Sequence, residues 1–173
     1  SGEGNNPTGG ANITYSTDAG EGTRSAQFDG SSDSTLTTNF NTTDEFTLFL
    51  RFKDSTGVAF KGLAGVQGGA GAGIYIQTGS VKVKLNDATL IQRALSSPSD
   101  WNKIMVTYNN IGANPTTTLY SEDGTVSTVT GTALVNNLMN LGANTTGALE
   151  YTGLMDDVRF YNELKDQTFF DAQ

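Results

Sequence analysis

The sequence predicts an all-β protein folded as a two-sheet antiparallel β-sandwich. Its 173 residues include 21 Gly and only 16% charged residues. The many Thr and aromatic residues favour strands, whereas Gly, Asn and Asp favour turns. About a dozen short strand patterns follow one another at intervals of about 8–12 residues. No amphipathic helical pattern of about 10–15 residues separates them, which argues against an α/β arrangement.

The polar, Gly-rich residues 1–12 are expected to be a flexible lead-in, and residues 13–173 a single domain. Ile13 and Tyr15 alternate with polar residues and indicate an edge strand. A short polar strand is expected to begin at 36, and the other strands are expected near 25–28, 46–53, 58–61, 74–77, 80–85, 89–93, 101–110, 116–121, 125–129, 138–141 and 149–161.

The clearest strand is "FTLFLRFK", residues 46–53. Because side chains alternate between the two faces of a strand, this pattern gives two different faces. One face holds Phe46, Leu48, Leu50 and Phe52, and the other holds Thr47, Phe49, Arg51 and Lys53.

Three other segments are expected to be turns, loops or helix. The run from 62 to 73, "GLAGVQGGAGAG", is too Gly-rich to be a strand throughout, and we interpret it as a mobile connector or a loop at a ligand rim. Glu122-Asp123-Gly124 predicts a hairpin turn. Asp166 is a candidate N-cap for one helical turn over 166–170.

Charge and composition exclude several classes of function. A net charge of −8 disfavours nucleic-acid binding, because phosphates would be repelled. No apolar run approaches the length of about 18 residues that a membrane span needs, so membrane insertion is not expected. The chain has neither Cys nor His, so any metal would be held by oxygen, which favours calcium or magnesium.

Five motifs in order resemble the laminin-G-like, concanavalin A-like lectin and glucanase domains, which are jelly-roll sandwiches. They are Phe28-Asp29-Gly30, Phe46-Thr47, Trp101 to Tyr108, Tyr120 to Gly124 and Gly153 to Tyr161. The resemblance covers about residues 24–170 and implies a jelly-roll fold. It does not fix the function, because lectins, glucanases, lyases, adhesion modules and virion proteins share this fold.

The adjacent carboxylates Asp156 and Asp157 stand in the last strand pattern. Strict alternation would separate them, with Asp156 on the apolar face of Leu154 and Asp157 in solvent beside Arg159. A carboxylate on an apolar face needs a partner. Three explanations stay open for Asp156: a calcium ion, hydrogen bonds alone, or a bulge that changes the register.

The resemblance implies the first of these explanations. In calcium-bearing relatives, an aspartate of the closing strand binds a structural calcium together with backbone carbonyls near the N-terminus. Asp156 resembles that aspartate, and the carbonyl of Gly30 is a plausible second ligand. A structural calcium ion is therefore the expected cofactor.

No residues can be assigned to ligand binding from the sequence. Trp101 opens an inward-patterned strand, so core packing is expected for it. Tyr75, Phe49 and Tyr120 are better placed than Trp101 to offer an exposed ring to a sugar.

An enzyme is not expected. The glucanases of this fold use a Glu-x-Asp-x-x-Glu strand, and no such spacing occurs here. The lyases of the fold use His, and a Ser nucleophile would lack its base.

The leading hypothesis is a non-catalytic carbohydrate-binding or adhesion module of an extracellular or surface assembly, with a glycan or surface protein as partner. The alternative is a display or attachment domain of a virion or larger surface protein that acts through protein–protein contacts, for which an oligomer would be compatible.

Overall fold

The fold is taken from a computed structural model, which describes residues 8–9, 12–31, 35–54, 60–67, 72–85, 91–95, 97–131, 133–134, 137–143 and 149–173. The predicted turn at 86–87, residues 32–33 of the turn at 29–33 and residues 68–71 of the Gly-rich run lie outside the described residues.

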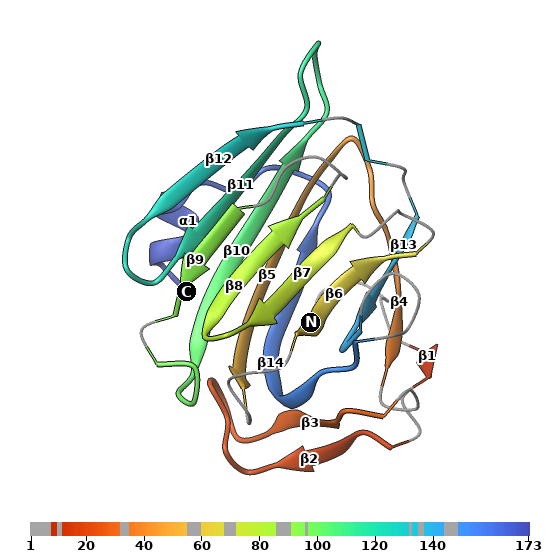
Figure 1. The fold of residues 1–173 in the computed structure, drawn as a ribbon, viewed down its shortest axis with the longest axis vertical. Coiled ribbons are helices and arrows are strands. Elements are labelled where there is room, and N and C mark those ends of the chain that lie inside the picture. The colour runs from red at the N-terminus through yellow and green to blue at the C-terminus, as the bar shows by residue number, and fades with distance from the viewer. Residues whose placement is uncertain are drawn as a thin grey trace.

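Two seven-stranded sheets pack face to face, which confirms the predicted antiparallel β-sandwich (Figure 1). In order across the first sheet, the strands are β1 (Thr8–Gly9), β4 (Leu36–Asn41), β13 (Leu138–Leu141), β6 (Lys61–Val66), β7 (Gly73–Gln77), β8 (Ser80–Lys84) and β9 (Ile91–Ala94). The second sheet consists of β12 (Val126–Thr130), β11 (Thr116–Ser121), β10 (Asn102–Asn109), β5 (Glu45–Asp54), β14 (Thr152–Tyr161), β3 (Ser25–Asp29) and β2 (Thr14–Ser16).

The main core lies between the sheets and follows the predicted alternation. The four apolar residues predicted to share a face of β5 are all buried there: Phe46, Leu48, Leu50 and Phe52. From the first sheet, Ile74, Ile76, Val81 and Val83 meet them. The predicted hairpin of β11 and β12 is also confirmed, because Tyr120 pairs with Val126 across it.

A second, small apolar cluster lies on the outer face of the second sheet. The helix α1 (Gln167–Asp171) covers Phe49 of β5 and Met105 of β10 with Phe170. Asp166 caps this helix, since its Oδ1 accepts a hydrogen bond from Phe169 N at 2.9 Å, as the sequence predicts. No helix in the described part of the chain has the length and hydrophobicity to cross a membrane.

The Gly-rich run is in part a strand, so its interpretation as a mobile connector or rim loop is wrong for residues 62–66. Its first residues belong to β6, which is buried along its whole length. Leu63, Ala64 and Val66 supply the core contacts that overcome the low strand propensity of glycine. Within the predicted lead-in, Thr8 and Gly9 pair with β4.

Candidate functional site

The bulge in β14 decides where the two adjacent aspartates point. Met155 lies in the core, and Val158 and Phe160 pack against it, so the inward positions change from odd to even. The pairing with β5 shifts between Asp156 and Arg159, and Asp157 has a φ of 48°. The expectation that Asp156 shares the apolar face is therefore wrong, because the bulge interrupts the alternation on which it rested.

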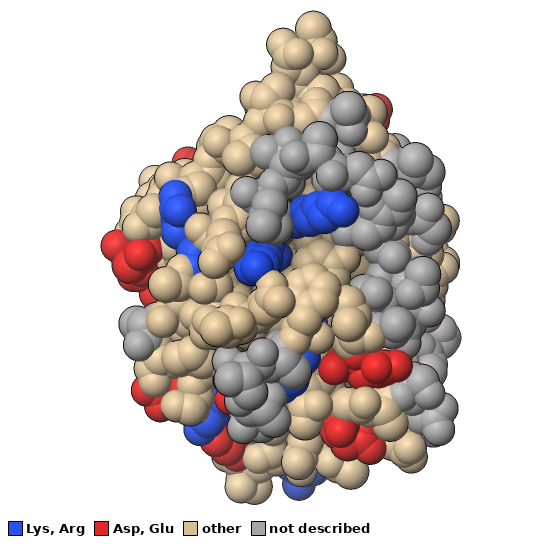
Figure 2. All heavy atoms as spheres, viewed as in Figure 1, with Lys and Arg blue, Asp and Glu red and all other residues tan. Residues whose placement is uncertain are grey.

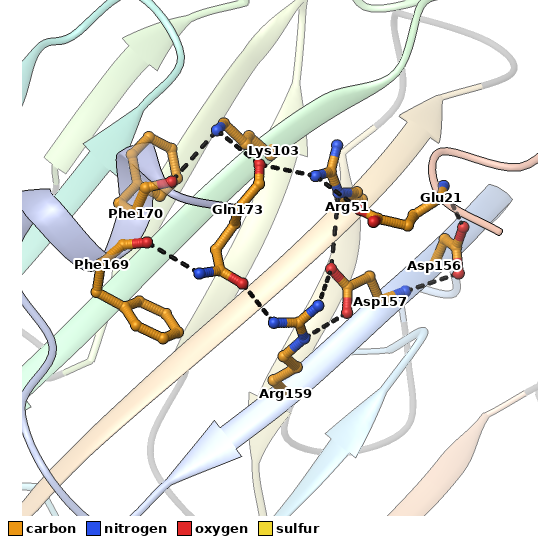
Figure 3. A network of polar contacts seen from close by, with 9 residues as sticks. All are labelled: Glu21, Arg51, Lys103, Asp156, Asp157, Arg159, Phe169, Phe170 and Gln173. Carbon is orange, nitrogen blue, oxygen red and sulfur yellow. Dashed lines mark hydrogen bonds and ion pairs between the residues drawn. The ribbon is translucent and has the colours of Figure 1, made fainter. Parts of the chain in front are cut away.

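Both aspartates belong to a polar network on the outer face of the second sheet (Figure 3). Asp157 pairs with Arg159, with Oδ1 2.5 Å from Nε and Oδ2 2.9 Å from Nη2. Arg51 Nε lies 3.7 Å from the same Oδ2. The predicted pairing of Asp157 with Arg159 is confirmed, but the carboxylate is only 12% exposed and is not a solvated surface group.

The chain's own C-terminal residues cover part of this network. The main-chain oxygen of Gln173 accepts from Arg51 Nη2 at 3.0 Å and from Lys103 Nζ at 3.3 Å. The side-chain amide of Gln173 donates to Phe169 O at 3.0 Å, and its oxygen accepts from Arg159 (Figure 3). The positively charged side chains of Arg51, Lys103 and Arg159 therefore already have hydrogen-bond partners within the chain.

Asp156 satisfies its carboxylate with backbone donors. Its Oδ2 accepts from Glu21 N and its Oδ1 from Asp157 N, both at 2.8 Å. Gly30 adjoins Asp29, whose partner on β14 is Thr152, so about five strand positions separate it from Asp156. That is about 16 Å, whereas calcium ligands lie about 2.3–2.6 Å from the ion.

A single calcium ion held by both Asp156 and Gly30 therefore does not fit this geometry. Among the described residues, no group of three or more Asp and Glu side chains is placed to hold a metal ion.

Trp101 lies outside the main core, so its expected core packing is wrong. Its indole Nε1 donates to Asp18 Oδ1 at 2.9 Å, and its ring covers Gly20 so closely that a Cβ there would lie 2.8 Å from Cε3. Asp18 also binds Lys53 Nζ at 2.7 Å. These hydrogen bonds, from Lys53 first and then Trp101, lower the pKa of the Asp18 carboxyl.

None of the three rings named as candidates for an exposed ring is exposed. Phe49 is covered by α1, and Tyr120 is half-buried beside Phe170. Tyr75 is buried and stacks on Phe60, with ring centroids 4.9 Å apart. Burial also raises the pKa of Tyr75. None of the three is a ready platform for a sugar.

A pocket of about 470 Å³ opens at the end of the second sheet where β2 and β3 lie. Leu154, half-buried, forms its centre, because it pairs with Gln27 on one side and Lys53 on the other. Polar side chains surround Leu154 from four strands and the loop before β10: Ser16, Gln27, Asp29, Lys53, Ser99 and Thr152. This volume is in the range of small-molecule sites.

An ion pair and hydrogen bonds hold the wall of this end pocket together. Asp54, with a side chain 0% exposed, binds Lys61 Nζ at 2.8 Å, and the same ammonium donates to Thr152 O at 3.2 Å. Tyr151 OH donates to Lys53 O at 2.8 Å, and burial raises the pKa of this phenol well above its ordinary value. Gly153 has a φ of 156°, and a Cβ there would lie 2.4 Å from Lys53 O.

A second polar surface lies on the outer face of the first sheet. Because Val81 and Val83 point into the core, Lys82 and Lys84 point outward from β8. Lys82 Nζ donates to Gln77 Oε1 at 2.6 Å. Figure 2 shows Lys and Arg side chains near the middle of this side of the molecule and Asp and Glu at its left edge and in its lower half.

Sequence reasoning did not find the end pocket. Its central row, Gln27, Leu154 and Lys53, comes from three strands that are far apart in the sequence. Gln27 and Lys53 alone are ordinary outward-facing strand positions, and strict alternation would place Leu154 on the apolar face, from which the bulge in β14 turns it away. Only the sheet order, which places β14 between β3 and β5, brings them together.

The comparisons with known proteins concern structure. No protein-family model matches the sequence, and a search of curated proteins found no match. The fold resembles the binding domain of Paraclostridial Mosquitocidal Protein 1, with a TM-score of 0.69 and 14% identity over 97% of this chain. It also resembles a structure described under "Cell entry of botulinum neurotoxin type C is dependent upon interaction with two ganglioside molecules", with a TM-score of 0.69 and 10% identity over 97% of this chain.

A third similar structure is the CBM40 of the Ruminococcus gnavus IT-sialidase bound to α2,3-sialyllactose, with a TM-score of 0.56 and 14% identity. That match covers 74% of this chain and 81% of the CBM40. The chain spans only 46% of each of the two toxin structures. At these identities the similarity shows a shared β-sandwich fold. It does not single out the laminin-G-like family.

Proposed function

We propose that this chain is a non-catalytic carbohydrate-binding module that holds a glycan in the end pocket. The observation that carries the proposal is the pocket itself, in which hydroxyl, amide, carboxylate and ammonium groups surround the half-buried Leu154. Sugars combine hydroxyl groups with small apolar surfaces. A site for them needs polar groups in fixed positions around an apolar contact, and this pocket offers both.

The structural comparisons support the proposal to different degrees. The CBM40 match is the more direct support, because most of a domain bound to sialyllactose corresponds to this chain. The ganglioside interaction belongs to a structure more than twice as long as the matched part, so it supports glycan binding only in general. A secreted or surface-exposed setting would follow from a glycan partner.

The carboxylates of the pocket suit binding better than hydrolysis. Hydrolysis of a glycosidic bond uses two carboxyl groups that both face the substrate. Asp54 is fully buried against Lys61, which leaves Asp29 as the exposed carboxylate among the described lining residues. We therefore expect the bound glycan to be released unchanged.

A glycan array with wild type and two matched variants tests the proposal. Gln27→Ala removes a polar group of the pocket, whereas Gln92→Ala removes the same exposed side chain from β9, outside it. One lost hydrogen bond of about 0.5–1.5 kcal/mol predicts that Gln27→Ala weakens binding about two- to tenfold. Gln92→Ala should bind as wild type does.

Two results would count against the proposal. One is the retention of no glycan by the wild type. The other is a glycan whose affinity is the same for Gln27→Ala and Gln92→Ala, which would move the site elsewhere.

A further inference from the structure

We infer that the end pocket accepts an uncharged sugar and discriminates against an acidic one. This inference rests on the proposed function and names the class of ligand for the same site. It differs from the sialyllactose seen in the similar CBM40, so the two structures would share a fold without sharing a ligand class.

The charges around the pocket disfavour an anionic ligand. Among the described residues that line it, Lys53 is the only Lys or Arg, whereas Asp29 and Asp54 are both present. Asp18 adds a third carboxylate, bound directly to Lys53. If Lys61, which pairs with Asp54, is counted as well, three carboxylates and two ammonium groups lie at or beside the pocket. The chain as a whole carries a net charge of −8, so the wider field also repels anions.

Both ammonium groups are already paired with carboxylates. Lys53 Nζ lies 2.7 Å from Asp18 Oδ2, and this carboxylate is held in place by Trp101. Lys61 Nζ lies 2.8 Å from Asp54, and its side chain is 5% exposed. A sugar carboxylate at the pocket would therefore find no uncompensated positive charge among these residues.

Arginine has the planar guanidinium that suits carboxylates best. All ten Lys and Arg residues lie in the described part of the chain, and no Arg lines the pocket. Arg51, on the same face of β5 as Lys53, lies 3.0 Å from Glu21 and donates to Gln173 O. It is thus committed to other partners.

The groups that do line the pocket suit neutral hydroxyls. The carboxylate of Asp29 accepts hydrogen bonds only, and its Oδ1 is oriented by Ser31 N at 2.9 Å and Ser31 Oγ at 2.7 Å. Gln27 both donates and accepts. A sugar hydroxyl can donate a hydrogen bond to Asp29 and can either donate to or accept from Gln27. A sugar carboxylate would be repelled by Asp29.

The test is a titration of the full chain, followed by NMR, with neutral glycans and the sialylated form of each. Lactose and α2,3-sialyllactose are one such pair. We expect the sialylated form to bind about two- to tenfold more weakly than the neutral form at low salt. This difference in affinity should become smaller as salt screens the repulsion. Asp29→Asn, which keeps an acceptor oxygen for Ser31, should reduce the difference in affinity between the neutral and the sialylated form. Asp171→Asn, at an exposed position in α1, should not.

The outcomes separate this inference from the proposed function. Tighter binding of the sialylated forms would overturn the inference and leave the glycan-binding proposal standing. If Asp29→Asn leaves the difference in affinity between the neutral and the sialylated forms unchanged, the inference is also overturned. Binding of neither form in any pair would instead overturn the proposed function.

Discussion

The buried ion pair of Asp54 and Lys61, which supports the pocket wall, gives the sharpest stability prediction. In Lys61→Met, the carboxylate of Asp54, 0% exposed, loses its ammonium partner while the aliphatic stem is retained. Removal of one partner of a buried ion pair costs about 3–5 kcal/mol, because the other charge stays buried. The free energy of unfolding of a domain is about 5–15 kcal/mol, so about a fifth of it or more is at stake.

An exposed pair in the same chain provides the matched control. Lys165 and Glu163 approach to 2.5 Å, but their side chains are 23% and 64% exposed. Lys165→Met should cost less than about 1 kcal/mol, because solvent screens such pairs. Asp54→Leu combined with Lys61→Met should recover much of the loss, since a buried pair is often replaced by apolar residues at little cost.

Urea unfolding followed by circular dichroism measures all three variants. With a slope of about 2 kcal/mol per molar urea, a loss of 4 kcal/mol lowers the midpoint of Lys61→Met by about 2 M. A Lys61→Met midpoint as close to wild type as that of Lys165→Met would refute the reasoning. It would mean that the buried carboxylate is satisfied without its ammonium group.

Three further predictions concern the carboxylates outside the pocket. Asp157 has a φ of 48° and binds Arg159, so Asp157→Ala should cost about 1–3 kcal/mol in urea unfolding. Asp157→Asn should cost less, because Asn tolerates this backbone conformation, and equal losses would contradict that account. Because the pKa of Asp18 is lowered, its contribution to stability is present above the ordinary aspartate pKa and is lost as pH falls through the lowered value. The fluorescence of Trp101, the single Trp, should follow the titration of Asp18. Lys53→Met should raise the pH midpoint of this titration. A midpoint that does not move would exclude Lys53 as the main cause of the lowered pKa. Asp156→Ala should lose the same free energy of unfolding, about 1 kcal/mol, in calcium and in EDTA, because both carboxylate oxygens accept backbone N–H groups. A loss confined to the calcium sample would restore the calcium site predicted from the resemblance.

Local sequence patterns predicted the parts of the fold that local physics decides. The alternation in β5 correctly placed Phe46 and Leu48 in the core, because a strand with one apolar face has a single favourable orientation. The N-cap role of Asp166 was also predictable, since it depends on a contact only three residues away. The sequence did not show that α1 covers Phe49, because that contact joins residues distant in the chain.

The errors arose where tertiary contacts override local preference. β6 is a strand despite its glycines, because Leu63 and Val66 fill the core. The alternation failed in β14, because a bulge with a positive φ lies at Asp157. Aspartate tolerates this conformation, so the sequence left a bulge open as one of three explanations for Asp156 but did not decide among them. The end pocket was missed for a different reason. Gln27, Leu154 and Lys53 become neighbours only through the order of the strands.

The most direct test of the central claim, that a glycan binds in the end pocket, is a map of backbone amide shift changes in the isotopically labelled chain. A glycan retained on the array should be titrated until the changes reach saturation. We predict the largest changes at Gln27, Asp29, Thr152 and Leu154. Changes centred instead on Gln77 and Lys82, on the outer face of the first sheet, would contradict the proposed site.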